Sequence, residues 1–242
     1  MATLKAEQKK QRVERLSSVR EFVFGVQDGV LTTAGVLFGL SGAVSGRLEV
    51  ILAALASTAA GAMSMGAGAY LGTRAESEVI RGELDRMRRA TQSEPYVIQE
   101  ELLGSLAAEG LSRETSYRVV KLLSSSPKLL LATVEEKVYG LGGAMLGNPA
   151  ADGLVMGAAF LVGALVPLLP FVLISNQRVG LAAALVTTAG ALFAVGYFVG
   201  WLADSERRWP SALRFLLIAL GAASIGYLVG LAISPLGATA GP

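Results

Sequence analysis

Five apolar segments, each long enough to cross a bilayer as a helix, constrain the fold of this chain more than any other feature. A spanning helix needs about 20 predominantly apolar residues to cross roughly 30 Å of hydrocarbon. The segments are residues 22–44, 50–73, 152–175, 179–202 and 211–234. The chain is also 52% hydrophobic, with 29 glycines in 242 residues. We therefore predict an all-α, polytopic membrane protein with five transmembrane helices.

A charged segment separates the second and third spans and predicts a helical insert. Within this insert, Pro95 and Pro127 suit helix starts, Gly110 suits a helix end, and Ser112 suits a helix N-cap. The predicted order is a charged leader, two spans, the insert, three spans and a short tail. These parts correspond to residues 1–21, 22–73, 74–151, 152–234 and 235–242.

The placement of lysine and arginine predicts the orientation of the chain. Nineteen of the 21 basic residues lie in the leader, in the insert, or around the loop between the last two spans. Only Arg47 and Arg178 lie on the opposite side. Because basic residues accumulate on the cytoplasmic side, we expect the leader and the 74–151 insert to be cytoplasmic and the C-terminus to be outside. The leader is expected either to lie on the membrane surface as an amphipathic helix or to be solvated.

Asp28 lies inside the first apolar segment, FVFGVQDGVLTTAGVLFGLSGAV. A carboxylate at this depth costs about 2.5–3.5 kcal/mol on insertion scales, so such residues usually face a polar pathway. The alternative is an aspartate near the helix end that pairs with a base or reaches the interface. In the second span, Met65 offers a thioether sulfur, although a methionine there can equally fill the core.

The absence of cysteine and histidine excludes several classes of chemistry. Thiolate and imidazole metal ligands, disulfides and Cys or His nucleophile pairs cannot form. Residues 39–42, GLSG, superficially resemble an intramembrane protease motif, but no histidine is present as a base. No glycine-rich phosphate loop followed by lysine occurs. We expect no enzymatic activity, no tightly bound cofactor and, with a net charge of only +2, no nucleic-acid partner.

Four stretches together resemble the vacuolar iron transporter family. They are REFVFGVQDGVLTTAGVLFGLSGA (20–43), AGAMSMGAGAYLG (60–72), GALVPLLPFVLI (163–174) and LRFLLIALGAASIGYLVG (213–230). Each motif is weak alone, but the set follows the family order and spacing over nearly the whole chain beyond about residue 18.

The resemblance implies a homodimer whose paired first spans line a route for divalent metal ions. It further implies that Fe²⁺ or Mn²⁺ leaves the cytoplasm, by exchange for protons. Asp28 matches the family's transport-path carboxylate, and Met65 matches its pathway methionine. A hard carboxylate combined with a soft thioether suits Fe²⁺ better than Mg²⁺ or Ca²⁺. Met63 should point to a different helix face from Met65.

The sequence also departs from the family pattern. Ala69 stands where members usually carry glutamate before the second-span tyrosine. In the insert, family glutamate positions hold Met87, Ala90, Ile98 and Val138, and a methionine pair appears as Val134 and Glu135. Only Glu101 matches a family glutamate there. The resemblance thus predicts an insert that keeps its fold but loses most of its metal cluster, with Glu101 and Glu135 as remaining candidate metal ligands. A solvated acidic helix face is the alternative.

Two functional hypotheses follow. The first is a divalent metal exporter embedded in a lipid bilayer, expected in a bacterial plasma membrane from the compact Ala/Gly/Arg-rich composition. The second is a divergent member that no longer moves metal and acts as a membrane scaffold or regulator, or carries another solute. The departures at Ala69, Ile98 and Val138 motivate the second hypothesis.

Overall fold

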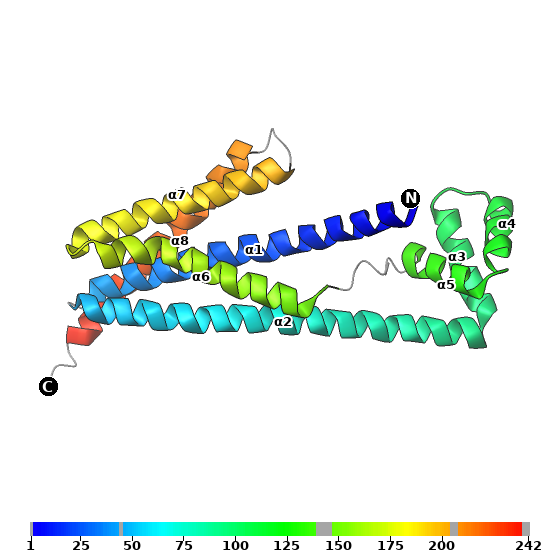
Figure 1. The fold of residues 1–242 in the computed structure, drawn as a ribbon, viewed down its shortest axis with the longest axis horizontal. Helices are drawn as coiled ribbons and strands as arrows, with labels where there is room; N and C mark the ends of the chain where they lie inside the picture. Colours follow the sequence, from blue (N-terminus) through cyan, green and yellow to red (C-terminus); the bar gives the residue numbers. More distant parts are fainter. Residues whose placement is uncertain (1, 44–45, 139–146, 204–207, 239–242) are drawn as a thin grey trace. The chain divides into compact units, whose positions relative to one another are not determined.

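The computed structural model describes residues 2–43, 46–138, 147–203 and 208–238, and its regular structure there is helical. The chain divides into two compact units. The spanning unit combines Arg15–Leu71 with Pro149–Pro242, and the insert unit combines Met1–Glu14 with Gly72–Asn148. Figure 1 shows the helices of each unit along the chain.

Four helices in the described part of the chain are long and apolar enough to cross a membrane. They are Val19–Ser41 within α1 (Ala2–Ala43), α2 (Arg47–Ser93), α6 (Pro149–Leu173) and Gln177–Leu202 within α7 (Gln177–Ala203). These correspond to the first four predicted spans. The fifth predicted span falls in α8 (Arg208–Ala238), many of whose side chains lie outside the described residues, and it stays a prediction.

The predicted leader is not a separate element from residue 2 onward, because α1 is one helix of 42 residues. The first 23 positions of α1 contain no glycine or proline, so no residue there favours a helix end between the leader and the first span. The side chains before Val19 lie outside the described residues. The expected amphipathic face of the leader therefore stays untested.

Close glycine contacts bring α1 against α6 inside the spanning unit. A Cβ added at Gly25 would lie 2.6 Å from the Met156 carbonyl oxygen. One added at Gly29 or Gly163 would overlap the backbone of the facing helix. The bare glycine surfaces let the two backbones approach, as small residues commonly do between membrane helices. Val26, Val30, Ala159 and Leu192 then form a buried cluster that joins α1, α6 and α7.

Backbone carbonyls near the end of α6 accept hydrogen bonds from side chains of other helices. Pro170 has no N–H to offer the Val166 carbonyl, and the Thr187 hydroxyl of α7 donates to that oxygen at 3.3 Å. The Arg47 guanidinium at the start of α2 donates to the carbonyls of Phe171, Val172 and Ile174 at 2.7–3.0 Å. A cation at this position also complements the negative end of the helix dipole.

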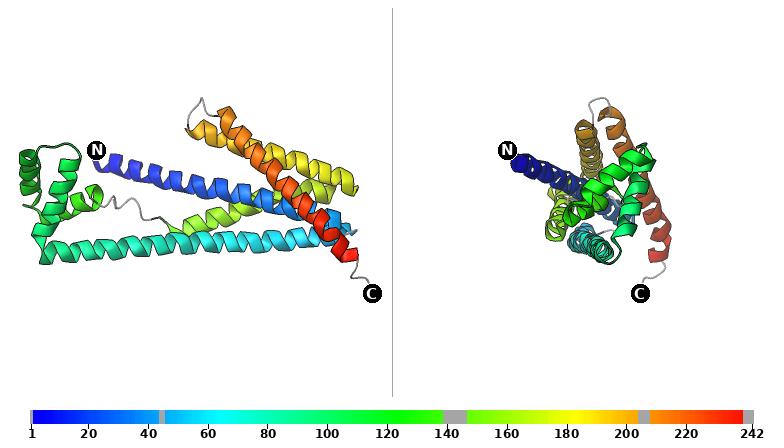
Figure 2. Two further views of the ribbon diagram at one scale, coloured as in Figure 1. Left: turned by 180° about the vertical axis from the view of Figure 1, so that it is seen from behind. Right: turned by 90° about the vertical axis from the view of Figure 1, so that its right-hand side faces the viewer.

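Helices α6 and α7 pack side by side, as do α7 and α8 (Figure 2).

The insert unit contains three short helices, α3 (Pro95–Ala108), α4 (Arg113–Leu123) and α5 (Pro127–Lys137). Their starts agree with the predicted signals at Pro95, Ser112 and Pro127. Ser112 accepts a hydrogen bond from the Thr115 N–H at 3.2 Å. Gly110 ends α3 with φ of +95°, while Leu111 N–H bonds to the Leu106 carbonyl, which is a Schellman cap.

Candidate functional site

Asp28 lines a pocket of about 350 Å³ in the spanning unit, formed where α1, α2 and α6 meet. The residues that line it are Asp28, Thr32, Ser57, Ala60, Gly61, Ser64, Met65 and Phe160. The Asp28 side chain is half-buried and lies within the Val19–Ser41 span. The two residues predicted to form the ion site, Asp28 and Met65, therefore border the same pocket.

The glycine contacts explain why Asp28 faces this pocket. Gly29 packs on the backbone of Phe160, which fixes the rotation of α1 next to Asp28. On α2, Gly61 lies directly over the Phe160 ring, where any side chain would overlap it. Phe160 is 1% exposed and packs with Ala62, Ala164 and Met65. The aromatic ring thus forms an apolar floor below the polar groups of α1 and α2.

Asp28 has neither a hydrogen bond nor an ion pair with any residue that the structure describes. This observation argues against the alternative in which a basic side chain pairs with it. An unpaired carboxylate in a membrane-spanning helix is unfavourable unless water or a cation reaches it. The pocket places a thioether and three hydroxyl groups around that carboxylate, which is a donor set for a cation of intermediate softness.

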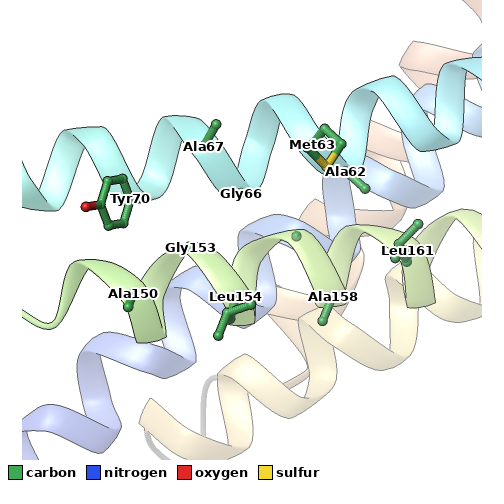
Figure 3. Close-up of a pocket in the computed structure, with 11 residues that line it drawn as sticks. Ala62, Met63, Gly66, Ala67, Tyr70, Ala150, Gly153, Leu154, Ala158 and Leu161 are labelled. Atoms are coloured by element: carbon green, nitrogen blue, oxygen red, sulfur yellow. The ribbon is translucent and has the colours of Figure 1, made fainter.

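Met63 and Met65 line different pockets, as their spacing on one helix predicts. Met63 is 76% exposed and borders a larger apolar groove of about 620 Å³ between α2 and α6. Figure 3 shows this groove, with Met63, Ala67 and Tyr70 on α2 and Leu154 and Leu161 on α6. Glycines Gly66, Gly153 and Gly157 bring the two helices together there. Met63 is therefore not one of the residues around Asp28.

Sequence reasoning missed three hydroxyl groups that line the Asp28 pocket. Thr32 follows Asp28 by one helical turn, so both project from the same face of α1. Ser57, Gly61 and Ser64 have the i, i+4, i+7 spacing of one face of α2. That spacing is visible in the sequence, but many small residues share it. Only the packing of α1 on α2 shows which face meets Asp28.

The insert has an apolar core where the family resemblance places metal ligands. Ile98 is 2% exposed and Val134 is fully buried, in one cluster with Leu102, Leu106, Val120 and Leu130. Ala90 and Val138 pack against the same cluster. Among the described residues, no group of three or more His, Cys, Asp or Glu side chains is placed to hold a metal ion.

Glu101 and Glu135 lie on α3 and α5 of this insert and are half-buried. Glu135 forms an ion pair with Arg88, whose Nε lies 4.0 Å from the Glu135 Oε1. A guanidinium beside a carboxylate lowers its attraction for a metal cation. The role of these two glutamates as metal ligands stays a prediction, and the arginine and the apolar core limit it to a weak site.

Calorimetry of the full-length protein in detergent tests this prediction. In the Asp28→Asn background, we expect any remaining Mn²⁺ binding to have a Kd on the order of 10⁻⁴–10⁻³ M, the range of weak sites in proteins. That binding should disappear when Glu101→Gln and Glu135→Gln are added. Binding in the micromolar range that survives Asp28→Asn would show that the insert retains a strong metal site.

Comparison with known proteins identifies the family of this chain. Residues 19–231 match the VIT family. The chain is 31% identical over 214 residues to "Vacuolar iron transporter 2" of Oryza sativa subsp. japonica, covering 88% of this chain and 86% of that protein. It is 30% identical over 209 residues to "Vacuolar iron transporter 1" of Eucalyptus grandis, covering 86% and 84%. "Protein CCC1" of Saccharomyces cerevisiae is 28% identical over 181 residues, covering 74% and 56%. The chain therefore belongs to the VIT family.

Proposed function

We propose that this protein is a membrane transporter that exports Fe²⁺ or Mn²⁺ from the cytoplasm through a pathway containing the Asp28 pocket. The observation that carries the proposal is the shared pocket of Asp28 and Met65 within helices long enough to span a bilayer. The curated relatives are named as iron transporters, which supports iron as the transported ion. The metal is cargo here, and the protein needs no resident cofactor.

The carboxylate and the thioether have different tasks in this proposal. Asp28 compensates part of the charge of a divalent cation that has left water, which is costly in a low-dielectric medium. The Met65 sulfur adds a soft ligand, which favours transition metals over Mg²⁺ and Ca²⁺. One carboxylate per chain neutralises only half of the ion's charge. Two copies of Asp28 would neutralise it fully.

A homodimer supplies that second carboxylate. Only 22% of the apolar window of α2 is buried within one chain, less than in the other three described spans. Its exposed residues include the small residues Ala56, Ala59, Ala60, Ser64, Ala67 and Gly68 beside the larger Leu52, Leu55 and Met63. Small residues at a helix surface favour close helix–helix packing in membranes. We propose that a second copy covers this face and closes the pocket, with α1 of each chain lining the route.

The direction of transport and its energy source follow from orientation and composition. The cytoplasmic side is assigned by the basic residues of the leader and insert. The sequence has no phosphate-binding loop for ATP, and we propose that transport is driven by exchange for protons. Relatives are named as vacuolar proteins, whereas we propose the bacterial plasma membrane for this chain. Export from the cytoplasm is the same reaction in either membrane.

A second candidate function is a VIT protein that has stopped moving metal and acts as a membrane scaffold or regulator, or carries another solute. The apolar core of the insert favours it, because Ile98 and Val134 occupy positions where the resemblance places metal ligands. At position 69, where the resemblance places a glutamate, this chain has Ala69 and so lacks a further carboxylate. The two functions differ in whether the purified protein moves divalent metal across a membrane.

Flux measurements on Asp28→Asn distinguish them. In proteoliposomes with an imposed pH gradient, we expect the wild type to move Fe²⁺ and Mn²⁺ and the variant to lose about 100-fold in rate. A 100-fold loss corresponds to about 2.7 kcal/mol of lost ion stabilisation, since each 1.4 kcal/mol is about tenfold. Asp85→Asn, at an exposed carboxylate of α2 paired with Arg88, is the matched control and should keep full flux. Full flux in Asp28→Asn would refute the pathway, and absent flux in the wild type would favour the second candidate.

Cross-linking tests the dimer, and the absence of native cysteine makes it unambiguous. We expect Ala56→Cys, on the exposed face of α2, to form a disulfide-linked dimer on mild oxidation in membranes. Val186→Cys, at a 70% exposed position of α7, should remain monomeric under the same conditions. Equal cross-linking at both positions, or none at Ala56→Cys, would contradict this interface.

A further inference from the structure

The hydroxyl groups of Thr32, Ser57 and Ser64 line the Asp28 pocket without hydrogen-bond partners among the described residues. Helical Ser and Thr side chains usually bond to the carbonyl one turn earlier. Several other hydroxyls in this chain do so, including Thr91 to Met87 at 2.8 Å and Ser224 to Leu220 at 2.7 Å, whereas Ser41 and Thr188 outside the pocket also lack a partner. The three pocket hydroxyls are therefore free to bind a ligand.

A neighbouring pair shows what an ordinary structural hydroxyl does at this crossing. Thr33 and Thr58, each next in sequence to a pocket residue, are buried and bond to each other at 3.3 Å. That bond joins α1 to α2 and satisfies both groups. Thr32 and Ser57 point instead into the pocket that contains Asp28 and Met65. Thr33 and Thr58 thus join the two helices, and the adjacent face of each helix presents a hydroxyl group to the pocket that has no hydrogen-bond partner among the described residues.

Hydroxyl oxygens would complete a coordination shell that Asp28 and Met65 leave unfinished. Mn²⁺ and Fe²⁺ lose water on entering the pocket, and one carboxylate and one thioether per chain replace only part of it. Additional carboxylates would bind the ion too strongly for release and would add negative charge at membrane depth. Neutral hydroxyls supply hard oxygen ligands, directly or through a bound water, without changing the net charge.

We propose that Thr32, Ser57 and Ser64 are specificity-determining ligands of the transported ion, a proposal that rests on the transport function assigned to the Asp28 pocket. Their hard oxygens favour Mn²⁺ and Fe²⁺, while the Met65 sulfur favours later, softer ions. The balance between the two kinds of ligand sets which divalent metal the protein moves. Removing oxygens should shift the preference towards softer ions, and removing the sulfur should shift it the other way.

Competitive flux of Mn²⁺ and Co²⁺ into proteoliposomes tests this assignment. For the combined variant Thr32→Val, Ser57→Ala and Ser64→Ala, we expect the KM for Mn²⁺ to rise by about tenfold or more, with a much smaller rise for Co²⁺. Met65→Leu should change the ratio in the opposite direction. Ser224→Ala, a hydroxyl of α8 outside the pocket, is the control and should leave both KM values unchanged.

Conservative variants separate ligation from packing. Thr32→Ser and Ser57→Thr keep the hydroxyl while changing side-chain size, so they should retain the wild-type Mn²⁺/Co²⁺ ratio. If the combined variant does not fold, Thr32→Val and Ser57→Ala tested singly provide the readout. An unchanged ratio in the combined variant, or in Thr32→Val and Ser57→Ala tested singly, would overturn the assignment even if Asp28→Asn still reduced flux about 100-fold. Full flux in Asp28→Asn would instead refute the transport pathway itself.

Discussion

The glycine contact between α1 and α6 is the constraint on which the proposed site depends. Gly25 and Gly29 on α1 and Gly163 on α6 allow the two backbones to touch, and Gly29 lies next to Asp28. This contact sets the rotation of α1 and so directs Asp28 towards α2 and the Phe160 ring. A side chain at Gly29 would separate the helices, and the carboxylate, thioether and hydroxyls would no longer share one pocket. The same glycine contacts therefore determine both the packing of α1 on α6 and the residues that line the Asp28 pocket.

Much of the fold could be predicted because bilayer dimensions leave few alternatives. Apolar runs of the required length gave four helices that the structure describes, and local signals at Pro95, Gly110, Ser112 and Pro127 marked the insert helices. The sequence did not predict whether the leader and the first span form one helix, because a change from charged to apolar residues does not itself end a helix, and α1 runs through both. Asp28 was recognisable as a charge in an apolar run. Thr32, Ser57 and Ser64 were not, since helical hydroxyls are common and only interhelical packing shows which of them line the pocket with Asp28.

The two units differ in what their interiors contain. The insert buries Ile98, Leu102 and Val134 in an apolar core, which stabilises a small bundle without any bound metal. The spanning unit keeps an unpaired carboxylate and a thioether together at one pocket. In the proposed account the insert does not concentrate metal, and recognition of the ion falls to the pocket lined by α1, α2 and α6.

Direct localisation of the ion tests the central claim. Anomalous scattering from the protein crystallised with Mn²⁺, recorded at the manganese absorption edge, locates the metal independently of any transport assay. We predict a peak within ligand distance of the Asp28 carboxylate and adjacent to the Met65 sulfur, and its loss in crystals of Asp28→Asn. A strong peak confined to the insert, or Asp28 in contact with lipid while the metal lies elsewhere in the spanning unit, would contradict the account.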